Sequence, residues 1–270
     1  MTSTAAPAAL RAQRASVARA FTQILWRDIF VTGRELLVFL AQVVLQPFFL
    51  LFVFGRILTD LGFARAGYAS LLVPGVVSLT IVLTALQSTA FPLVIDFSFT
   101  KEIEDRLLAP LPVWLVGIEK MVFAALRALI AGAVMIPIAA LVIRGLHLSA
   151  DHVPLVLLFA VLAAFVGAAM GLTLGTMVPP NRINIMFALV LTPLLFTGCS
   201  QYPWPSLSRL PWFKVVTLFN PMTYASEGLR ASLLPAVPHM NVGVAAAVLA
   251  LALVLFTATG VRGFLRRAID

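Results

Sequence analysis

Long apolar stretches alternate along the chain with short segments that carry most of its charges. No Asp, Glu, Lys or Arg occurs from Leu36 to Gly55 or from Ala66 to Ile95. One helix needs about 20 consecutive apolar residues to cross a bilayer core. The pattern therefore predicts an all-α, polytopic membrane protein with six transmembrane helices. The predicted spans cover residues 36–57, 70–93, 121–143, 153–177, 183–201 and 241–261.

Composition excludes several other classes of protein. Hydrophobic residues make up 61% of the 270 residues and charged residues only 11%, with a mean hydropathy of +1.03. A soluble domain usually has about 25% charged residues. A soluble enzyme, a disordered protein and a nucleic-acid-binding protein are therefore excluded, in spite of a net charge of +8. The single cysteine, Cys199, excludes an internal disulfide.

The distribution of basic residues predicts the orientation in the membrane. If the N-terminus is cytoplasmic, thirteen of the 19 Lys and Arg residues fall in or beside the inner segments. Basic residues are enriched in cytoplasmic loops of membrane proteins. We therefore expect a multi-pass protein of the cell (plasma) membrane with both termini in the cytoplasm, in contact with membrane lipid.

Residues 14–34 precede the first span and have an amphipathic pattern. The predicted apolar side holds Val17, Phe21, Ile24, Leu25 and Ile29, and the polar side holds Arg19, Gln23, Arg27 and Arg34. Asp28 and Phe30 depart from this pattern. We expect an interfacial helix whose basic face meets lipid headgroups. The alternative is a basic anchoring tail without helical structure.

The segment 96–120 is predicted to be a cytoplasmic loop with a docking function. Its charges cluster at Lys101, Glu102, Glu104, Asp105 and Arg106, and Leu107 and Leu108 follow at once. Pro110 and Pro112 would then end a helix. A short helix with a charged face and a leucine pair suits docking into a groove on a soluble partner. The alternative is a loop whose charges only keep it solvated.

The segment 202–239 is predicted to lie at the outer surface as short re-entrant helices. Prolines at four positions forbid one long helix, namely Pro203, Pro205, Pro211 and Pro221. Aromatic residues make the segment too apolar for an ordinary exposed loop, namely Trp204, Trp212, Phe213, Phe219 and Tyr224. Backbone that does not span the bilayer is tolerated at membrane depth where protein covers it.

Motifs for chemistry are missing from the sequence. There is no phosphate-binding Gly-x-x-x-x-Gly-Lys-Ser/Thr motif and no nucleophile elbow, so we expect no catalytic residues and no bound cofactor. His147, Asp151 and His152 lack a fourth ligand, so no metal site is expected. Arg56 lies at the end of the first predicted span, and the only charge deep inside a predicted span is Arg127, which could reach the interface or face a partner helix. The energy for transport would have to come from another protein.

Six polar residues in the first, second and fifth spans are candidates for a transport pathway. They are Gln42, Gln46, Thr84, Gln87, Ser88 and Thr192. The alternative is that these side chains only form hydrogen bonds between helices.

These features, in this order, resemble the type-2 ABC exporter permeases, which include daunorubicin-type drug exporters and polysaccharide exporters. The resemblance covers nearly the whole chain. It rests on the amphipathic N-terminal helix, the six spans, the charged Leu-Leu-x-Pro-Leu loop at 102–112 and the outer motif Leu-Phe-Asn-Pro-Met-Thr-Tyr at 218–224. One departure is the stretch 199–205, which replaces a more usual Gly-x-x-x-Pro turn.

The resemblance implies one permease domain over residues 1–270 and a function in export. It implies two copies of a separate ATP-binding subunit, which would hold ATP and Mg²⁺, and a second permease copy, identical or related. The charged loop would be the coupling helix, and the outer gate would comprise Asn220, Pro221, Tyr224, Glu227 and Arg230. The substrate stays open between an apolar drug, a lipid and a lipid-linked glycan. A membrane-embedded transferase and a proton-driven transporter remain as alternatives.

Overall fold

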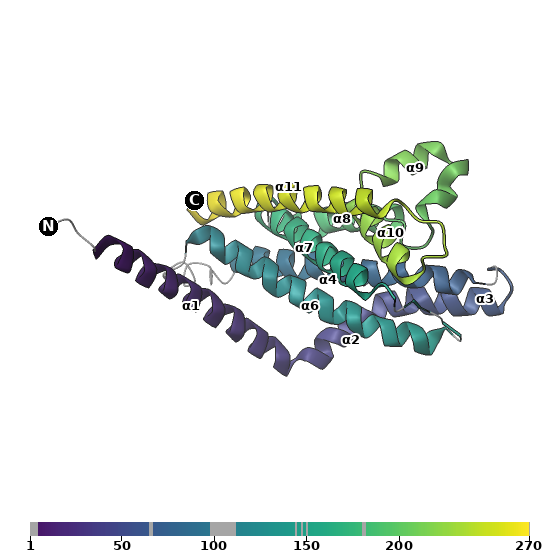
Figure 1. The fold of residues 1–270 in the computed structure, drawn as a ribbon, viewed down its shortest axis with the longest axis horizontal. Coiled ribbons are helices and arrows are strands. Elements are labelled where there is room, and N and C mark those ends of the chain that lie inside the picture. Colours follow the sequence, from purple (N-terminus) through teal and green to yellow (C-terminus); the bar gives the residue numbers. More distant parts are fainter. Residues whose placement is uncertain are drawn as a thin grey trace.

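The computed structural model describes the backbone of residues 5–64, 67–97, 112–143, 145–146, 148–149, 151–179 and 182–269. These residues form helices and connecting turns, and no strand occurs among them (Figure 1). The prediction of an all-α fold is confirmed. The helices are α1 (Ala5–Arg34), α2 (Leu36–Leu50), η1 (Leu51–Ile57), α3 (Leu58–Asp60), α4 (Tyr68–Ile95), α6 (Val113–Val142), α7 (Val153–Met177), α8 (Ile183–Thr197), η4 (Trp204–Arg209), α9 (Pro211–Thr217), α10 (Pro221–Leu233) and α11 (Val242–Ile269).

Five helical segments of the described chain are long and apolar enough to cross a membrane. They are Leu36–Asp60, Tyr68–Ile95, Val113–Val142, Val153–Met177 and Val242–Arg267. The first consists of α2, the π-helical turns of η1 and α3. The remaining predicted span, 183–201, is the 15-residue helix α8, which at 1.5 Å per residue is about 22 Å long. Because α8 is shorter than a bilayer core, the count of six spans stays a prediction.

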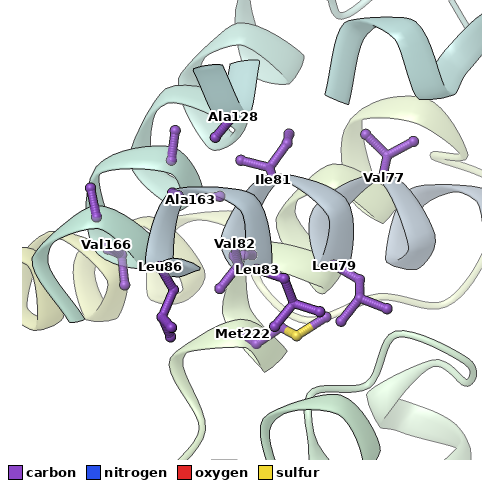
Figure 2. Packing of buried hydrophobic residues seen from close by; sticks show 14 of the residues in the cluster. Val77, Leu79, Ile81, Val82, Leu83, Leu86, Ala128, Ala163, Val166 and Met222 are labelled. Carbon is purple, nitrogen blue, oxygen red and sulfur yellow. The ribbon is translucent and has the colours of Figure 1, made fainter. Parts of the chain in front are cut away.

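Helix α4 forms the centre of the bundle and packs against α6, α7 and α10. Its contact with α7 is close because Gly167, Gly171 and Gly175 lie four residues apart and face α4. A Cβ atom on Gly167 would lie 2.6 Å from the Val82 carbonyl oxygen, so only glycine fits there. Such small residues allow helix backbones to approach closely in membranes. Figure 2 shows the apolar side chains that fill the remaining space around α4.

Contacts between the helix ends define two ends of the bundle (Figure 1). At the first, which we call the Asp96 end, Lys120 in the second turn of α6 forms a 3.3 Å ion pair with Asp96, the residue that follows α4. Arg267 of α11 donates there to the carbonyl oxygen of Gly175, at a distance of 3.1 Å. The opposite end, which we call the α10 end, holds α3, η4, α9 and α10. The two ends differ in chemistry, which becomes important for the candidate site.

Helix α8 connects the two ends although it is short. It follows α7, whose last turn lies at the Asp96 end. Beyond its C-terminus, Ser200 lies against Gly75, near the start of α4 at the opposite end. The hydroxyl of Tyr68 also donates to the carbonyl oxygen of Gln201. Residues 183–201 therefore run from one end of the bundle to the other, and their crossing of the membrane as a sixth span stays a prediction.

The predicted loop at 96–120 is too long by eight residues at its C-terminal side. Pro112 is the N-cap of α6, and residues 113–120 belong to that helix. The charged residues Asp96 and Lys120 form a buried ion pair, whereas the sequence analysis placed both in a cytoplasmic loop. Residues 98–111 lie outside the described part. All seven coupling candidates fall among them, namely Lys101, Glu102, Glu104, Asp105, Arg106, Leu107 and Leu108.

Helix α1 is longer than the predicted helix at 14–34, since it begins at Ala5. Val17, Phe21 and Ile24 pack against the core, as the amphipathic pattern predicts. Ile29 is not among the residues that pack against the core, and it is 36% exposed. The helix leaves the bundle at an angle (Figure 1). Its position at a membrane interface stays a prediction.

Candidate functional site

A polar cavity of about 250 Å³ lies between α2, α4 and α6. Five of the six predicted pathway residues line it, namely Gln42, Gln46, Thr84, Gln87 and Ser88. Thr192 does not belong to this set, because it is exposed on α8 and is not part of the lining. Helical spacing brings the five together. Gln42 and Gln46 are one turn apart on α2, and the other three lie within about one turn of α4.

The cavity wall combines these polar groups with apolar side chains. Phe39 and Val43 contribute from α2, and Leu83 and Phe91 contribute from α4. All other residues of α2 are apolar, and its two amide side chains, Gln42 and Gln46, are exposed in the single chain. Polar groups facing lipid are costly and are usually turned toward protein or a water-filled cavity. The wall therefore suits a molecule with both polar and apolar parts.

Arg127 of α6 completes the cavity, and the sequence analysis did not include it among the pathway residues. Its guanidinium carbon lies 4.0 Å from the centroid of the Phe39 ring and 5.6 Å from that of Phe123. Its Nε is buried without a hydrogen-bond partner, and no ion pair joins it to an acidic residue of the described chain. The sequence offered one sign that Arg127 belongs to the site, because a lone charge inside a membrane span indicates a functional position by default.

The cavity belongs to the half of the bundle nearer the Asp96 end. Arg127 follows Lys120 by seven residues, so it lies about 10 Å along α6 from the Asp96–Lys120 ion pair, at the middle of α6. Gln42 is six residues from the start of α2, and Gln87 is eight residues from the end of α4. The three helices thus place their polar groups at a similar depth.

The predicted outer-gate residues lie together at the α10 end. Asn220 is the N-cap of α10: its Oδ1 accepts from the backbone N–H of Met222 at 2.9 Å. Its Nδ2 donates to the carbonyl oxygen of Leu194 at 3.2 Å and to Oγ1 of Thr197 at 2.9 Å. Pro221 occupies the first helical position, where its missing N–H costs nothing. Asn220 therefore joins the start of α10 to the end of α8.

Two further side chains fix the first turn of α10. The Thr223 hydroxyl lies 2.7 Å from the carbonyl oxygen of Thr217 and 3.1 Å from that of Thr197. The Tyr224 hydroxyl donates to the carbonyl oxygen of Leu218 at 2.9 Å. These bonds close the turn between α9 and α10. They satisfy backbone groups that would otherwise be buried without partners.

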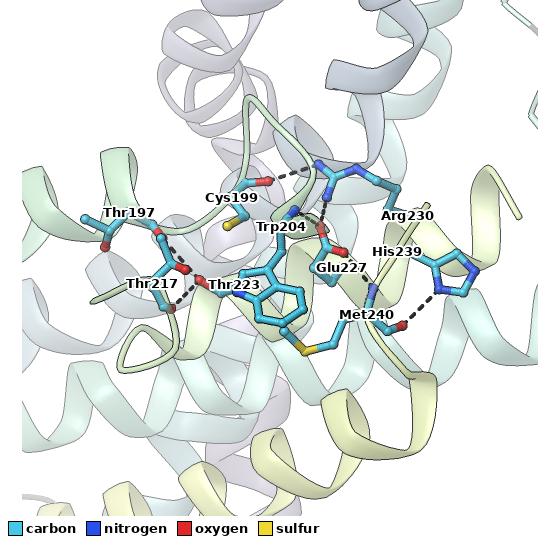
Figure 3. Close-up of polar contacts among 9 residues, drawn as sticks. All are labelled: Thr197, Cys199, Trp204, Thr217, Thr223, Glu227, Arg230, His239 and Met240. Carbon is cyan, nitrogen blue, oxygen red and sulfur yellow. Dashed lines mark hydrogen bonds and ion pairs between the residues drawn. The ribbon is translucent and has the colours of Figure 1, made fainter. Parts of the chain in front are cut away.

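Glu227 and Arg230 form an ion pair that is completely buried, with both side chains 0% exposed (Figure 3). The Glu227 carboxylate accepts from the Arg230 guanidinium, from the Trp204 backbone N–H at 2.9 Å and from the Met240 backbone N–H at 2.8 Å. The second guanidinium nitrogen donates to the Cys199 carbonyl oxygen at 2.9 Å. The ion pair on α10 thus joins three other parts of the chain. They are the turn after α8, the first residue of η4 and the segment before α11.

The turn at 198–202 shows what the sequence departure at 199–205 does. Cys199 has a φ of 50°, in the left-handed region that favours glycine, and its carbonyl oxygen is held by Arg230. The Tyr202 hydroxyl donates to the carbonyl oxygen of Phe196. Burial raises the pKa of Tyr202 to about 12, so this hydroxyl stays protonated to a higher pH than that of an exposed tyrosine. The turn is therefore held from both sides, with Cys199 instead of a glycine in the left-handed conformation.

Metal-binding side chains do not gather in the described residues, where no three His, Cys, Asp or Glu lie close enough to hold an ion. The geometry consists instead of a polar cavity near one end and a hydrogen-bonded cap at the other. All five predicted gate residues belong to that cap, and whether they gate transport stays a prediction.

Comparison with known proteins identifies the family. The family model of the ABC-2 type transporter matches residues 19–234, from α1 to the end of α10. The comparison with curated proteins finds no match to this chain. The matched region contains both the cavity and the α10 cap. The chain therefore belongs to the ABC-2 type transporter family, and it is a multi-pass membrane permease of an ABC transporter.

Proposed function

We propose that this permease exports a hydrophobic or amphiphilic molecule, such as a drug, a lipid or a lipid-linked glycan, from the cytoplasm or the inner leaflet. The observation that carries the proposal is the cavity between α2, α4 and α6, in which polar side chains from two apolar helices converge. Such a wall offers hydrogen bonds to a polar group and apolar contacts to the rest of the molecule.

The position of the cavity supports the direction of transport. The charge-dense segment 101–106 connects α4 to α6 and so follows directly from the Asp96 end. The excess of basic residues favours a cytoplasmic location for that end. With six crossings, both termini would then be cytoplasmic, and the cavity would lie at the depth of the inner leaflet. A substrate would enter there and leave past the α10 cap.

The energy would come from two copies of a separate ATP-binding subunit. The loop residues from Lys101 to Leu108 would form the coupling helix that docks on this subunit. A second permease copy, identical or related, would cover the exposed side of α2 and complete the pathway. ATP-driven movement of the coupling helices would then shift the permease between two conformations, as energetic coupling requires.

The test is export into or out of proteoliposomes that contain the permease and its ATP-binding subunit. The double substitution Glu104→Ala with Arg106→Ala is expected to reduce ATP-dependent export at least tenfold at unchanged protein level, because these side chains would contact the ATPase. The matched control is Arg56→Ala with Asp60→Ala, which removes an exposed ion pair at the α10 end and should leave export unchanged. Export and ATPase stimulation that survive the loop substitutions would refute the coupling assignment. Export that persists without ATP would favour a proton-driven transporter.

A further inference from the structure

The proposed function leaves the charge of the substrate open, and the cavity contains an observation that bears on it. We infer that the cavity binds the acidic headgroup of an anionic amphiphile, with Arg127 as the countercharge. The physiological meaning of this inference rests on the proposed export function. Binding itself is a property of the permease alone and can be measured separately.

The first argument is the electrostatic environment of Arg127. Among the described residues that line the cavity, it is the one charged group, and the others are neutral polar or apolar. An arginine inside a membrane protein is normally paired with an acidic group or with backbone carbonyls. Here the guanidinium faces the Phe39 ring at 4.0 Å, and its Nε has no hydrogen-bond partner. A cation–π contact compensates only part of the lost hydration.

The second argument is the set of neighbouring donors. Gln42, Gln46 and Gln87 each carry an amide NH₂ group, and Ser88 carries a hydroxyl. A carboxylate or phosphate has more acceptor positions than one guanidinium fills, so these donors can bind its remaining oxygens. A cationic headgroup would meet the like charge of Arg127 in a medium of low dielectric constant. The donor set therefore favours an anion over a cation.

The third argument is size. A cavity of about 250 Å³ falls below the range of roughly 300–1,000 Å³ that encloses a drug-sized ligand. It is large enough for a headgroup. The wall also contains Phe39, Leu83 and Phe91, and the Phe91 side chain is exposed at the surface of α4. The tail of an amphiphile would follow these side chains out of the cavity and remain in the hydrocarbon region.

The test compares two amphiphiles that differ only in headgroup charge. The full-length permease, in nanodiscs of phosphatidylcholine and without any ATP-binding subunit, is titrated with oleoyl lysophosphatidate and with oleoyl lysophosphatidylcholine. We expect the anionic compound to bind at least tenfold more tightly. Inorganic phosphate at millimolar concentration should not displace it, because phosphate lacks the tail. Displacement by phosphate alone would show a simple anion site and overturn the assignment to an amphiphile.

Substitutions of Arg127 test whether this side chain causes the preference for the anionic headgroup. Arg127→Gln should abolish the difference between the two compounds, and Arg127→Lys should retain part of it. Arg209→Gln is the control, because Arg209 is an exposed arginine of η4, at the opposite end of the bundle and outside the cavity. It should leave the preference unchanged. Thermal unfolding of each variant checks that the protein is folded.

Several results would overturn the inference. Equal binding of the two compounds by the unaltered protein would do so without any variant, even if Arg127→Gln did not fold. A preference that Arg127→Gln leaves intact would also do so. A different result would refute the proposed export function. In that case the permease alone would prefer the anionic headgroup, but no amphiphile would be transported with ATP when the ATPase is present. Movement without headgroup preference would refute only the inference.

Discussion

The substitution Glu227→Gln tests whether the α10 cap depends on charge pairing. The glutamine keeps the shape of the side chain but removes the negative charge beside Arg230, which is completely buried. It also replaces one acceptor oxygen by an NH₂ group, which opposes the backbone N–H of either Trp204 or Met240. Breaking a buried pair by removing one partner costs about 3–5 kcal/mol, because the other charge stays buried without compensation.

This free energy corresponds to a decrease of about two to four powers of ten in the ratio of folded to unfolded protein. The assay is reversible unfolding in mixed detergent micelles with increasing sodium dodecyl sulfate. Ser232→Ala is the control on the same helix: its hydroxyl is also buried but donates only to the Gly228 carbonyl oxygen within α10. That change should cost no more than about 1 kcal/mol. If both variants unfold at the same point, the pair does not stabilise the cap.

Two further substitutions test the packing and the cap. Gly167→Ala should destabilise the bundle by about 1–3 kcal/mol in the same unfolding assay, because its methyl group would meet the Val82 carbonyl oxygen at 2.6 Å. Gly33→Ala is the control and should not destabilise the protein, because a Cβ atom on Gly33 would have no neighbour within 4 Å. Equal destabilisation by the two substitutions would contradict the close contact of α4 with α7. Asn220→Ala should cost about 1–2 kcal/mol through loss of a buried cap. The exposed Asn241→Ala should cost less, and the reverse order would refute the role of burial.

Hydropathy alone predicts most of the fold. The span at 153–177 coincides with α7, and the first, second and last spans agree with the helices to within a few residues at their N-terminal ends. The predicted loop at 96–120 was too long because charged residues were expected to be exposed to solvent and not to belong to a helix of the bundle. Asp96 and Lys120 neutralise each other in the bundle, and a pair of residues that are distant in sequence leaves no local signal. The helix of the third span therefore begins at Val113, eight residues before the predicted start at Met121.

The candidate site could be predicted only in part. Gln42, Gln46 and Gln87 were identified because polar residues in an apolar span are conspicuous, and the structure brings them to one cavity. The choice of Thr192 shows the limit of that reasoning, since polarity does not reveal which side of a helix faces a neighbour. For Arg127 the sequence left two possibilities open, the interface or a partner helix, and it could not identify Phe39 as the neighbour, because that contact depends on the packing of α2 on α6. Contacts of that kind require the tertiary structure.

The ion pair on α10 has a consequence for how the protein is made. Glu227 and Arg230 lie on one short helix, three residues apart, so each finds its opposite charge without waiting for another segment of the chain. Inserting an isolated charge into the bilayer would be far more costly than inserting the neutralised pair. If the segment is re-entrant, as the sequence predicts, it can enter the membrane already neutralised during synthesis. Only its bonds to Cys199, Trp204 and Met240 need to form later, when the neighbouring segments assemble around it.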